Sequence, residues 1–304
     1  MTSAAPTGTA RLLEGGPIAE DIHAANASRA ASFAARQGHP PALAVVVCGR
    51  TAPSMVYLRR ILAACARDGI DGRLVEVGGT EGEPGSDIEA QLVEAIRSLS
   101  ADPTVAGIIV QQPLLPSVRL RSVIDAIDPA KDIDGIHPLN AGLLRMGYEG
   151  FVPATAHATI EILQRSGVEI AGRHAAVIGR SAVVGLPAAF MLVKADATVT
   201  VCHSKTRDLP GRVREGDIVV VAAGRPGLVT GDMLKPGAVV VDVGINMVDG
   251  HLVGDVEFES ARLVASAITP VPGGVGPLTN ALLLAHLMRA AERQEATERG
   301  GGYE

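Results

Sequence analysis

Aromatic side chains are scarce in this chain. Of its 304 residues none is Trp, and only 2% are Phe, Tyr or Trp. Any flat ring that the protein binds must therefore be held mainly by aliphatic walls and hydrogen bonds. Basic residues are not in excess either. The net charge of −6 leaves no basic surface for nucleic acid.

Cysteines and long apolar runs are also few. Three cysteines, Cys48, Cys65 and Cys202, are widely spaced and form no metal-ligand pattern, which favours a reduced, cytoplasmic compartment and no metal site. Their ordinary role is that of small buried apolar residues. The N-terminal residues lack the apolar core of a signal peptide, and no uninterrupted apolar run is long enough to span a bilayer, so we expect no membrane partner.

What the chain has is length and a regular alternation of patterns. With 304 residues and 47% hydrophobic content it can bury a large core, and its size favours two domains. Helical and strand patterns alternate almost throughout, which predicts an α/β fold with a mainly parallel sheet in each domain. The expected helices are 17–37, 53–68, 86–99, 155–166 and 276–293, and the expected strands are 43–48, 73–77, 105–111, 175–178, 197–202, 217–222 and 238–243. We predict domains at 1–150, completed by the C-terminal helix 276–304, and at 151–275.

The stretch 174–206 has the pattern of half a nucleotide-binding sheet. An apolar run at 175–178 predicts a strand buried on both faces, and Gly179 ends it. Ser181 is placed to cap a helix that starts near Val183, and Gly185 allows close approach to the strand or to a phosphate. Arg180 adds a positive charge at the helix start. The spacing differs from Gly-x-Gly-x-x-Gly, so a tight turn without ligand remains open.

A second strand ends in His203, Ser204 and Lys205. In a doubly wound sheet the adenosine ribose lies at this strand end, where an acidic residue favours NAD. A hydroxyl and a cation suit a 2′-phosphate instead, so NADP is the better prediction. His203 is equally explained as a polar loop residue without a role.

Several further loops fall where strands end, the place at which open α/β sheets bind ligands. Each alone is ordinary turn chemistry. Together, in order, they resemble the methylenetetrahydrofolate dehydrogenase/cyclohydrolase family from about residue 11 to residue 290. The segments that carry the resemblance are Tyr57, VQQP at 110–113, KDIDGIHPLN at 131–140, VIGRSAVVGLP at 177–187, ATVTVCHSKT at 197–206, AAGRPG at 222–227, KPGAVVVDVGIN at 235–246 and TPVPGGVGP at 269–277.

The resemblance implies a fold and an activity. It implies a cytoplasmic homodimer of two-domain α/β chains, the second domain being a Rossmann-like doubly wound parallel sheet that binds NADP. Reduced folate would lie in the cleft between the domains. The family passes hydride from 5,10-methylenetetrahydrofolate to the nicotinamide, and then hydrolyses the methenyl cation to 10-formyltetrahydrofolate.

The resemblance also implies residue roles. Tyr57 would border the folate, Gln111 beside Val110 would lie against the reacting carbon, and Asp134 would accept hydrogen bonds from the pterin. A carboxylate that receives two such bonds in a dry cleft orients its ligand strongly. The remaining assignments place Pro272, Gly273 and Gly274 at the folate, and Gly179, Arg180, Ser181, Ser204 and Ile245 at the cofactor.

The chain departs from the family pattern at one catalytic position. The family has Tyr followed four residues later by Lys, on one helix face, where the lysine assists water attack and proton transfer. Here the residue is Ile61, which neither donates nor accepts. Arg60 is rotated by about 100° around the helix and is no simple substitute. The plain alternative is that the helix has rotated and Ile61 joins a core stripe of Leu58, Leu62 and Cys65.

Three functions therefore stand. The first is an NADP-dependent methylenetetrahydrofolate dehydrogenase with a weak or lost cyclohydrolase step, because hydride transfer needs mainly positioning and a dry site. The second is a bifunctional enzyme in which Arg60, or a water held by Gln111, replaces the lysine. The third is a paralogue that binds a folate-like ring without this turnover.

Overall fold

The computed structural model describes residues 9–49, 52–78 and 87–300, which fold into two compact units. Unit 1 comprises residues 1–20, 144–148 and 153–279, and unit 2 comprises 21–143, 149–152 and 280–304, within the described ranges. Residues 9–20 thus belong with the later part of the chain, which differs from the predicted boundary at residue 150. The reason is that Arg11 and Leu12 pair with Ala267 and Ile268.

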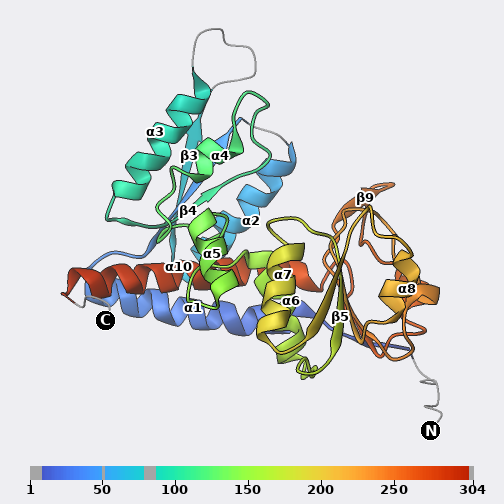
Figure 1. Cartoon of the computed structure of the whole chain (residues 1–304). Coiled ribbons are helices and arrows are strands. Elements are labelled where there is room, and N and C mark those ends of the chain that lie inside the picture. Colours follow the sequence, from blue (N-terminus) through green and yellow to red (C-terminus); the bar gives the residue numbers. More distant parts are fainter. Residues whose placement is uncertain (1–8, 50–51, 79–86, 301–304) are drawn as a thin grey trace. The chain divides into compact units, whose positions relative to one another are not determined.

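Unit 1 is built on a parallel sheet of six strands in the order β1-β11-β8-β7-β5-β6. The buried strands consist almost wholly of Val, Ile and Ala, as expected for a sheet covered on both faces. Figure 1 shows α6 and α7 on one side of this sheet and α8 on the other. The strands are β1 (Arg11–Leu12), β5 (His174–Ile178), β6 (Thr198–Cys202), β7 (Ile218–Val221), β8 (Val239–Asp242) and β11 (Ala267–Ile268), and a hairpin adds β9 (Asn246–Val248) and β10 (His251–Val253).

Helices separate most of the strands of unit 1 along the chain. They are α6 (Ala154–Arg165), α7 (Gly185–Lys194), α8 (Leu209–Arg214), α9 (Phe258–Ala261) and the 3-10 helix η1 (Gly231–Met233). The chain leaves β5 toward β6 on one side and then crosses to β7 on the other. The carboxyl ends of β5 and β7 therefore form the switch point at which such sheets bind nucleotides.

Unit 2 holds a parallel sheet of three strands in the order β3-β2-β4. Figure 1 shows α2 and α3 on opposite sides of it. The strands are β2 (Ala42–Cys48), β3 (Asp71–Val77) and β4 (Val105–Val110), and the helices within or partly within the unit are α1 (Gly15–Gln37), α2 (Ala52–Asp68), α3 (Ile88–Ala101), α4 (Leu120–Ile124), α5 (Pro138–Met146) and α10 (Val275–Glu298). The Pro- and Gly-rich stretch 114–150 thus contains two helices, α4 and α5, where only a connecting path was expected.

The two-domain α/β prediction is confirmed, and so is the Rossmann-like parallel sheet of the later domain. The predicted cleft between domains stays a prediction. No helix in the described part of the chain is long and apolar enough to cross a membrane.

Candidate functional site

Two glycines allow the backbone to pack tightly at the turn after β5. Gly179 has a φ of +126°, and a Cβ there would meet the carbonyl oxygen of Ala222 at 2.1 Å. A Cβ on Gly185 would meet the carbonyl oxygen of Gly179 at 2.2 Å. No side chain fits at either place, so the start of α7 lies close to the end of β5, as predicted from Gly185, and the end of β7 also lies close to this turn. The result is a cradle of bare backbone at a helix N-terminus, which suits a phosphate group.

Ser181 fixes the start of the helix. Its Oγ accepts the N–H of Val184 at 3.1 Å and that of Gly185 at 3.3 Å. Ser181 was predicted to cap a helix that starts near Val183, but α7 begins at Gly185 with Val184 as its N-cap residue, so Ser181 holds the turn that precedes the helix. Residues 181–184 form the turn instead, which leaves Ser181 and Arg180 exposed at its outer side.

The ends of β5 and β6 bring two more predicted residues to one edge. Ile178 pairs with Cys202 in parallel register, so Arg180 and Ser204 each lie two residues beyond a paired position. Both side chains are exposed, and in the described part of the chain neither has an acidic partner. Lys205 is exposed beside them. An unpaired guanidinium, an ammonium and a hydroxyl at neighbouring strand ends fit the 2′-phosphate of NADP better than a free ribose hydroxyl.

His203 has a structural role. Its backbone N–H donates to Thr206 Oγ1 at 2.8 Å, and its Nδ1 accepts the N–H of Lys205 at 3.1 Å. The side chain therefore shapes the turn that presents Ser204 and Lys205. This matches the alternative that gives His203 no direct role in chemistry.

The end of β8 carries an apolar side chain in an unusual place. Ile245 is 70% exposed, although it follows a buried strand by only three residues. Its neighbours are fixed by two buried carboxylates, Asp242 and Asp255, which sequence reasoning did not single out. The signal was an acidic residue close to a glycine in each segment, Asp242 two residues before Gly244 and Asp255 directly after Gly254, but nothing local links the two.

The Pro-Gly loop of unit 1 is tightly constrained. Gly274 donates its N–H to the carbonyl of Pro270 at 2.9 Å, and Gly273 has a φ of +111°. Gly15 donates its N–H to the carbonyl of Gly273 at 2.9 Å, and a Cβ on Gly15 would meet the Gly274 oxygen at 1.9 Å. Pro272 is exposed at the tip of the loop. The loop path is therefore fixed by backbone contacts, while the predicted contact of these residues with folate remains a prediction.

In unit 2, α2 presents Tyr57 and Ile61 one turn apart. Ile61 is 0% exposed, and Leu58 and Cys65 are buried beside it, whereas Leu62 is partly exposed. Burial, and then the nearby charge of Asp134, raise the pKa of the Tyr57 phenol above its ordinary value. Ile61 is therefore an enclosed apolar residue beside Leu58 and Cys65, as the core-stripe alternative expects, while Tyr57 one turn away senses the charge of Asp134.

Asp134 lies in a turn whose other members are firmly held. Asp132 is fully buried and accepts N–H groups from Ile136 at 3.1 Å and His137 at 2.8 Å, and from the Asn140 amide at 2.8 Å. Asp134 is partly exposed and, within the described residues, accepts no hydrogen bond. Burial and the neighbouring Asp132 charge raise the pKa of Asp134 to about 7. It is a carboxylate on a rigid frame, open to a donor from outside.

Gln111 has an unfilled acceptor. It follows Val110, the buried last residue of β4, and its Nε2 donates to the Gln112 carbonyl at 2.9 Å. Its Oε1 is buried and has no hydrogen-bond partner among the described residues. An orphaned acceptor of this kind costs free energy unless a ligand or water satisfies it. Tyr57, Gln111 and Asp134 all belong to unit 2, and the Tyr57–Asp134 interaction joins two of them.

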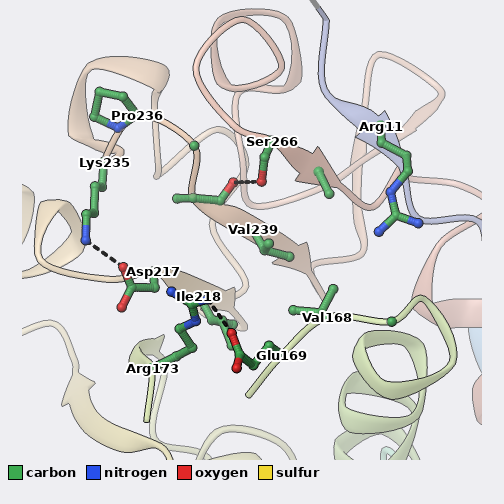
Figure 2. Close-up of a pocket in the computed structure, with 14 residues that line it drawn as sticks. Arg11, Val168, Glu169, Arg173, Asp217, Ile218, Lys235, Pro236, Val239 and Ser266 are labelled. Atoms are coloured by element: carbon green, nitrogen blue, oxygen red, sulfur yellow. Dashed lines mark hydrogen bonds and ion pairs between the residues drawn. The ribbon is translucent and has the colours of Figure 1, made fainter. Parts of the chain in front are cut away.

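A hollow of about 370 Å³ lies at the opposite, amino-terminal edge of the unit 1 sheet (Figure 2). It is lined by Arg11 and by two ion pairs, Lys235 with Asp217 at 2.6 Å and Arg173 with Glu169. Most of its charge is therefore already compensated. None of the predicted site residues lines it. Among the described residues, no group of three His, Cys, Asp or Glu side chains is arranged to hold a metal ion.

Comparison with known proteins gives matches over nearly the whole chain. Residues 13–134 match the catalytic domain of tetrahydrofolate dehydrogenase/cyclohydrolase, and residues 153–295 match its NAD(P)-binding domain. The bifunctional protein FolD of Bordetella avium is 48% identical over 286 residues, which cover 94% of this chain and 98% of that protein.

Solved structures agree. The bifunctional FolD methylenetetrahydrofolate dehydrogenase/cyclohydrolase of Campylobacter jejuni superposes with a TM-score of 0.88 at 38% identity, covering 93% of this chain and 98% of that one. The Trypanosoma brucei methylenetetrahydrofolate dehydrogenase-cyclohydrolase, complexed with NADP cofactor and inhibitor, has a TM-score of 0.87 at 38% identity and covers 94% and 99% of the two chains.

Proposed function

This chain belongs to the tetrahydrofolate dehydrogenase/cyclohydrolase family, and from that premise we propose that it oxidises 5,10-methylenetetrahydrofolate with NADP, while its cyclohydrolase step is weak or lost. The dehydrogenase part is supported by the cradle of Gly179 and Gly185. The cyclohydrolase part is carried by one observation, the enclosed side chain of Ile61 where the family has a lysine.

The cofactor assignment is supported by the charge at the carboxyl edge of the unit 1 sheet. NADP, when bound, supplies the nicotinamide that accepts the hydride. The chain contributes backbone N–H groups at the start of α7, with Arg180 and Ser204 for the 2′-phosphate and the exposed Ile245 as an apolar contact. A trypanosomal relative with NADP bound supports the same cofactor.

The substrate assignment is supported by the unsatisfied polar groups of unit 2. Asp134, when ionised, accepts the amide-type donors of a pterin edge, since no described residue donates a hydrogen bond to it. Gln111 Oε1 is a second open acceptor. Hydride transfer asks only that these groups orient the substrate and that water be kept away. An apolar Ile61 does not impair either requirement.

Hydrolysis makes a different demand. Water attack on the methenyl carbon requires a group that holds the water and accepts its proton. Ile61 does neither, and Arg60 is exposed to solvent on another face of α2. The orphaned Gln111 Oε1 favours the second candidate, a bifunctional enzyme whose water is held by Gln111.

The experiment is a pair of separate assays on the purified protein. One follows NADP reduction with 5,10-methylenetetrahydrofolate, and the other follows loss of 5,10-methenyltetrahydrofolate against the uncatalysed rate in the same buffer. The proposal predicts catalysed reduction with hydrolysis near the background. Catalysed hydrolysis as fast as reduction would establish the bifunctional candidate, and absence of both with folate still bound would establish the non-catalytic paralogue.

We also infer that the protein forms a homodimer through α7. Leu186, Phe190 and Val193 follow one another at helical spacing and are 37%, 38% and 55% exposed, and Val183 extends the stripe at 41%. Strand β6 is the adjacent edge of the sheet. An exposed apolar stripe beside a free sheet edge suits a self-complementary interface about a twofold axis.

A further inference from the structure

Two buried carboxylates connect the loops at the carboxyl ends of β7 and β8. Asp242 is the last residue of β8 and is 4% exposed, and Asp255 follows the β9–β10 hairpin and is 0% exposed. Buried carboxylates are costly unless hydrogen bonds satisfy them. Almost all hydrogen-bond donors to the two carboxylates are backbone N–H groups. Each carboxylate therefore fixes the path of the main-chain segments that donate to it.

Asp242 holds the segment that contains the second carboxylate. Its Oδ1 accepts the N–H groups of Gly244 and Asp255, both at 2.9 Å, and its Oδ2 accepts that of Val256 at 2.9 Å. Asp242 thereby places the backbone of Asp255 directly beside the end of β8.

Asp255 in turn holds the loop that follows β7. Its Oδ2 accepts the N–H groups of Ala223 at 2.6 Å and Gly224 at 2.8 Å, and its Oδ1 accepts that of Arg225 at 2.8 Å. Three successive N–H groups of this kind form a concave site for an anion, and here the anion is the protein's own carboxylate. The Asn246 amide donates to the same Oδ1 at 2.8 Å.

Two glycines are required by this arrangement. A Cβ on Gly244 would meet the Asp255 carboxyl carbon at 2.4 Å, and a Cβ on Gly254 would meet Asp242 Oδ2 at 1.8 Å. Both carboxylates therefore lie directly on the backbone of the opposite segment. The network leaves Ile245, between Gly244 and Asn246, held on both sides while its own side chain stays 70% exposed.

We propose that Asp255 is a positioning residue that sets residues 223–225 and Ile245 against the nicotinamide end of NADP. The direction follows from the sheet. With the 2′-phosphate end at β6 and the phosphates at the turn after β5, the other end of the dinucleotide lies across the switch point, beside β7 and β8. This inference rests on the proposed function, because it takes NADP to be the cofactor.

The test compares two ligands, NADP and 2′,5′-ADP, which keeps the phosphorylated adenosine and lacks the nicotinamide. In Asp255→Asn one acceptor oxygen becomes an NH₂ group that faces N–H donors. We expect calorimetry to show NADP affinity lowered about tenfold or more, because residues 223–225 and Asn246 lose charge-assisted hydrogen bonds that hold them in place, with 2′,5′-ADP affinity within about twofold of the wild type. The kcat of the dehydrogenase reaction should fall as well.

Asp217→Asn is the matched control. It removes a carboxylate at the amino end of β7, where Asp217 bonds to Lys235 and to the N–H of His174. It should leave the affinities for both ligands unchanged. If Asp255→Asn does not fold, Asn246→Leu decides, because it removes one of the four donors to Asp255 and leaves three backbone bonds in place.

The outcomes are separable. A selective loss of NADP affinity in Asp255→Asn, or in Asn246→Leu, supports the positioning role. Equal losses of both ligands, or no loss of either, overturn it. A wild-type protein that binds neither NADP nor 2′,5′-ADP would instead defeat the proposed function itself.

Discussion

Placing the family's lysine at position 61 is the most direct test of the role of this residue. Ile61 is 0% exposed, so Ile61→Lys removes a buried apolar side chain worth about 1.5–3 kcal/mol. An unpaired ammonium left in the same place would cost roughly 3–5 kcal/mol. Tyr57, one turn away, already senses the charge of Asp134, so a carboxylate is available near that face of α2. We expect Lys at position 61 to interact with Asp134, lowering the pKa of that carboxyl from about 7.

Methenyltetrahydrofolate hydrolysis should then rise by about 10²-fold, the usual contribution of a positioned acid–base group. The melting temperature should fall by several degrees, since about 1 kcal/mol corresponds to roughly 2–4 °C in a protein domain of this size range. Hydrolysis is measured by loss of the methenyl substrate, and stability by calorimetric melting.

Two variants control for the trivial effects of the substitution. Ile61→Met keeps the site apolar at similar volume and should leave hydrolysis at its wild-type level. Cys65→Lys places the same charge one turn further along α2, at a residue that is 1% exposed, and should destabilise the protein without any gain in hydrolysis. A folded Ile61→Lys protein that binds folate and hydrolyses no faster than the wild type would refute the idea that this residue sets the second activity.

Four further predictions concern the cofactor, substrate binding, stability and the dimer. Arg180→Ala should lower the affinity for NADP about tenfold or more and that for NAD much less, because one charge-assisted contact is lost. Equal losses of both affinities in calorimetry would show that Arg180 does not contact the 2′-phosphate. Because the pKa of Asp134 is raised to about 7, the affinity for folate should rise about tenfold from pH 6 to pH 8. Asp134→Asn should bind folate weakly and without this pH dependence, while its affinity for NADP stays unchanged. The same raised pKa means that Asp134 favours the folded state below about pH 4 and that this contribution is lost as pH rises to 7, so Asp134→Asn should melt above the wild type at pH 8. Phe190→Asp should convert the dimer to a monomer in light scattering after size exclusion, and an unchanged mass would show that the α7 stripe is not the interface.

Local patterns made the nucleotide-binding unit predictable. The apolar run of β5, the glycines at 179 and 185 and the hydroxyl of Ser181 lie within the short segment 175–185, and each follows from backbone geometry. Contacts between distant residues were out of reach of such patterns. Asp255 bonds to residues about 30 positions away, and α10 extends beyond the predicted end at residue 293 because Glu295 pairs with Arg36 at 2.7 Å, 259 positions away. The burial of Ile61 and the unsatisfied acceptor oxygen of Gln111 likewise depend on tertiary packing, which cannot be read from local sequence patterns.

The location of these groups explains how one reaction can be retained while the other is lost. In unit 1 the proposed cofactor contacts depend on backbone N–H groups, glycines and the Asp242–Asp255 network, all within that unit. In unit 2 the Asp134 turn is held by Asp132 and Asn140, neither of which belongs to α2. A substitution at position 61 therefore removes proton-transfer chemistry while the groups that orient cofactor and substrate keep their supports. Since hydride transfer depends on those groups and hydrolysis depends also on an acid–base residue, loss of the lysine is expected to separate the two activities rather than abolish both.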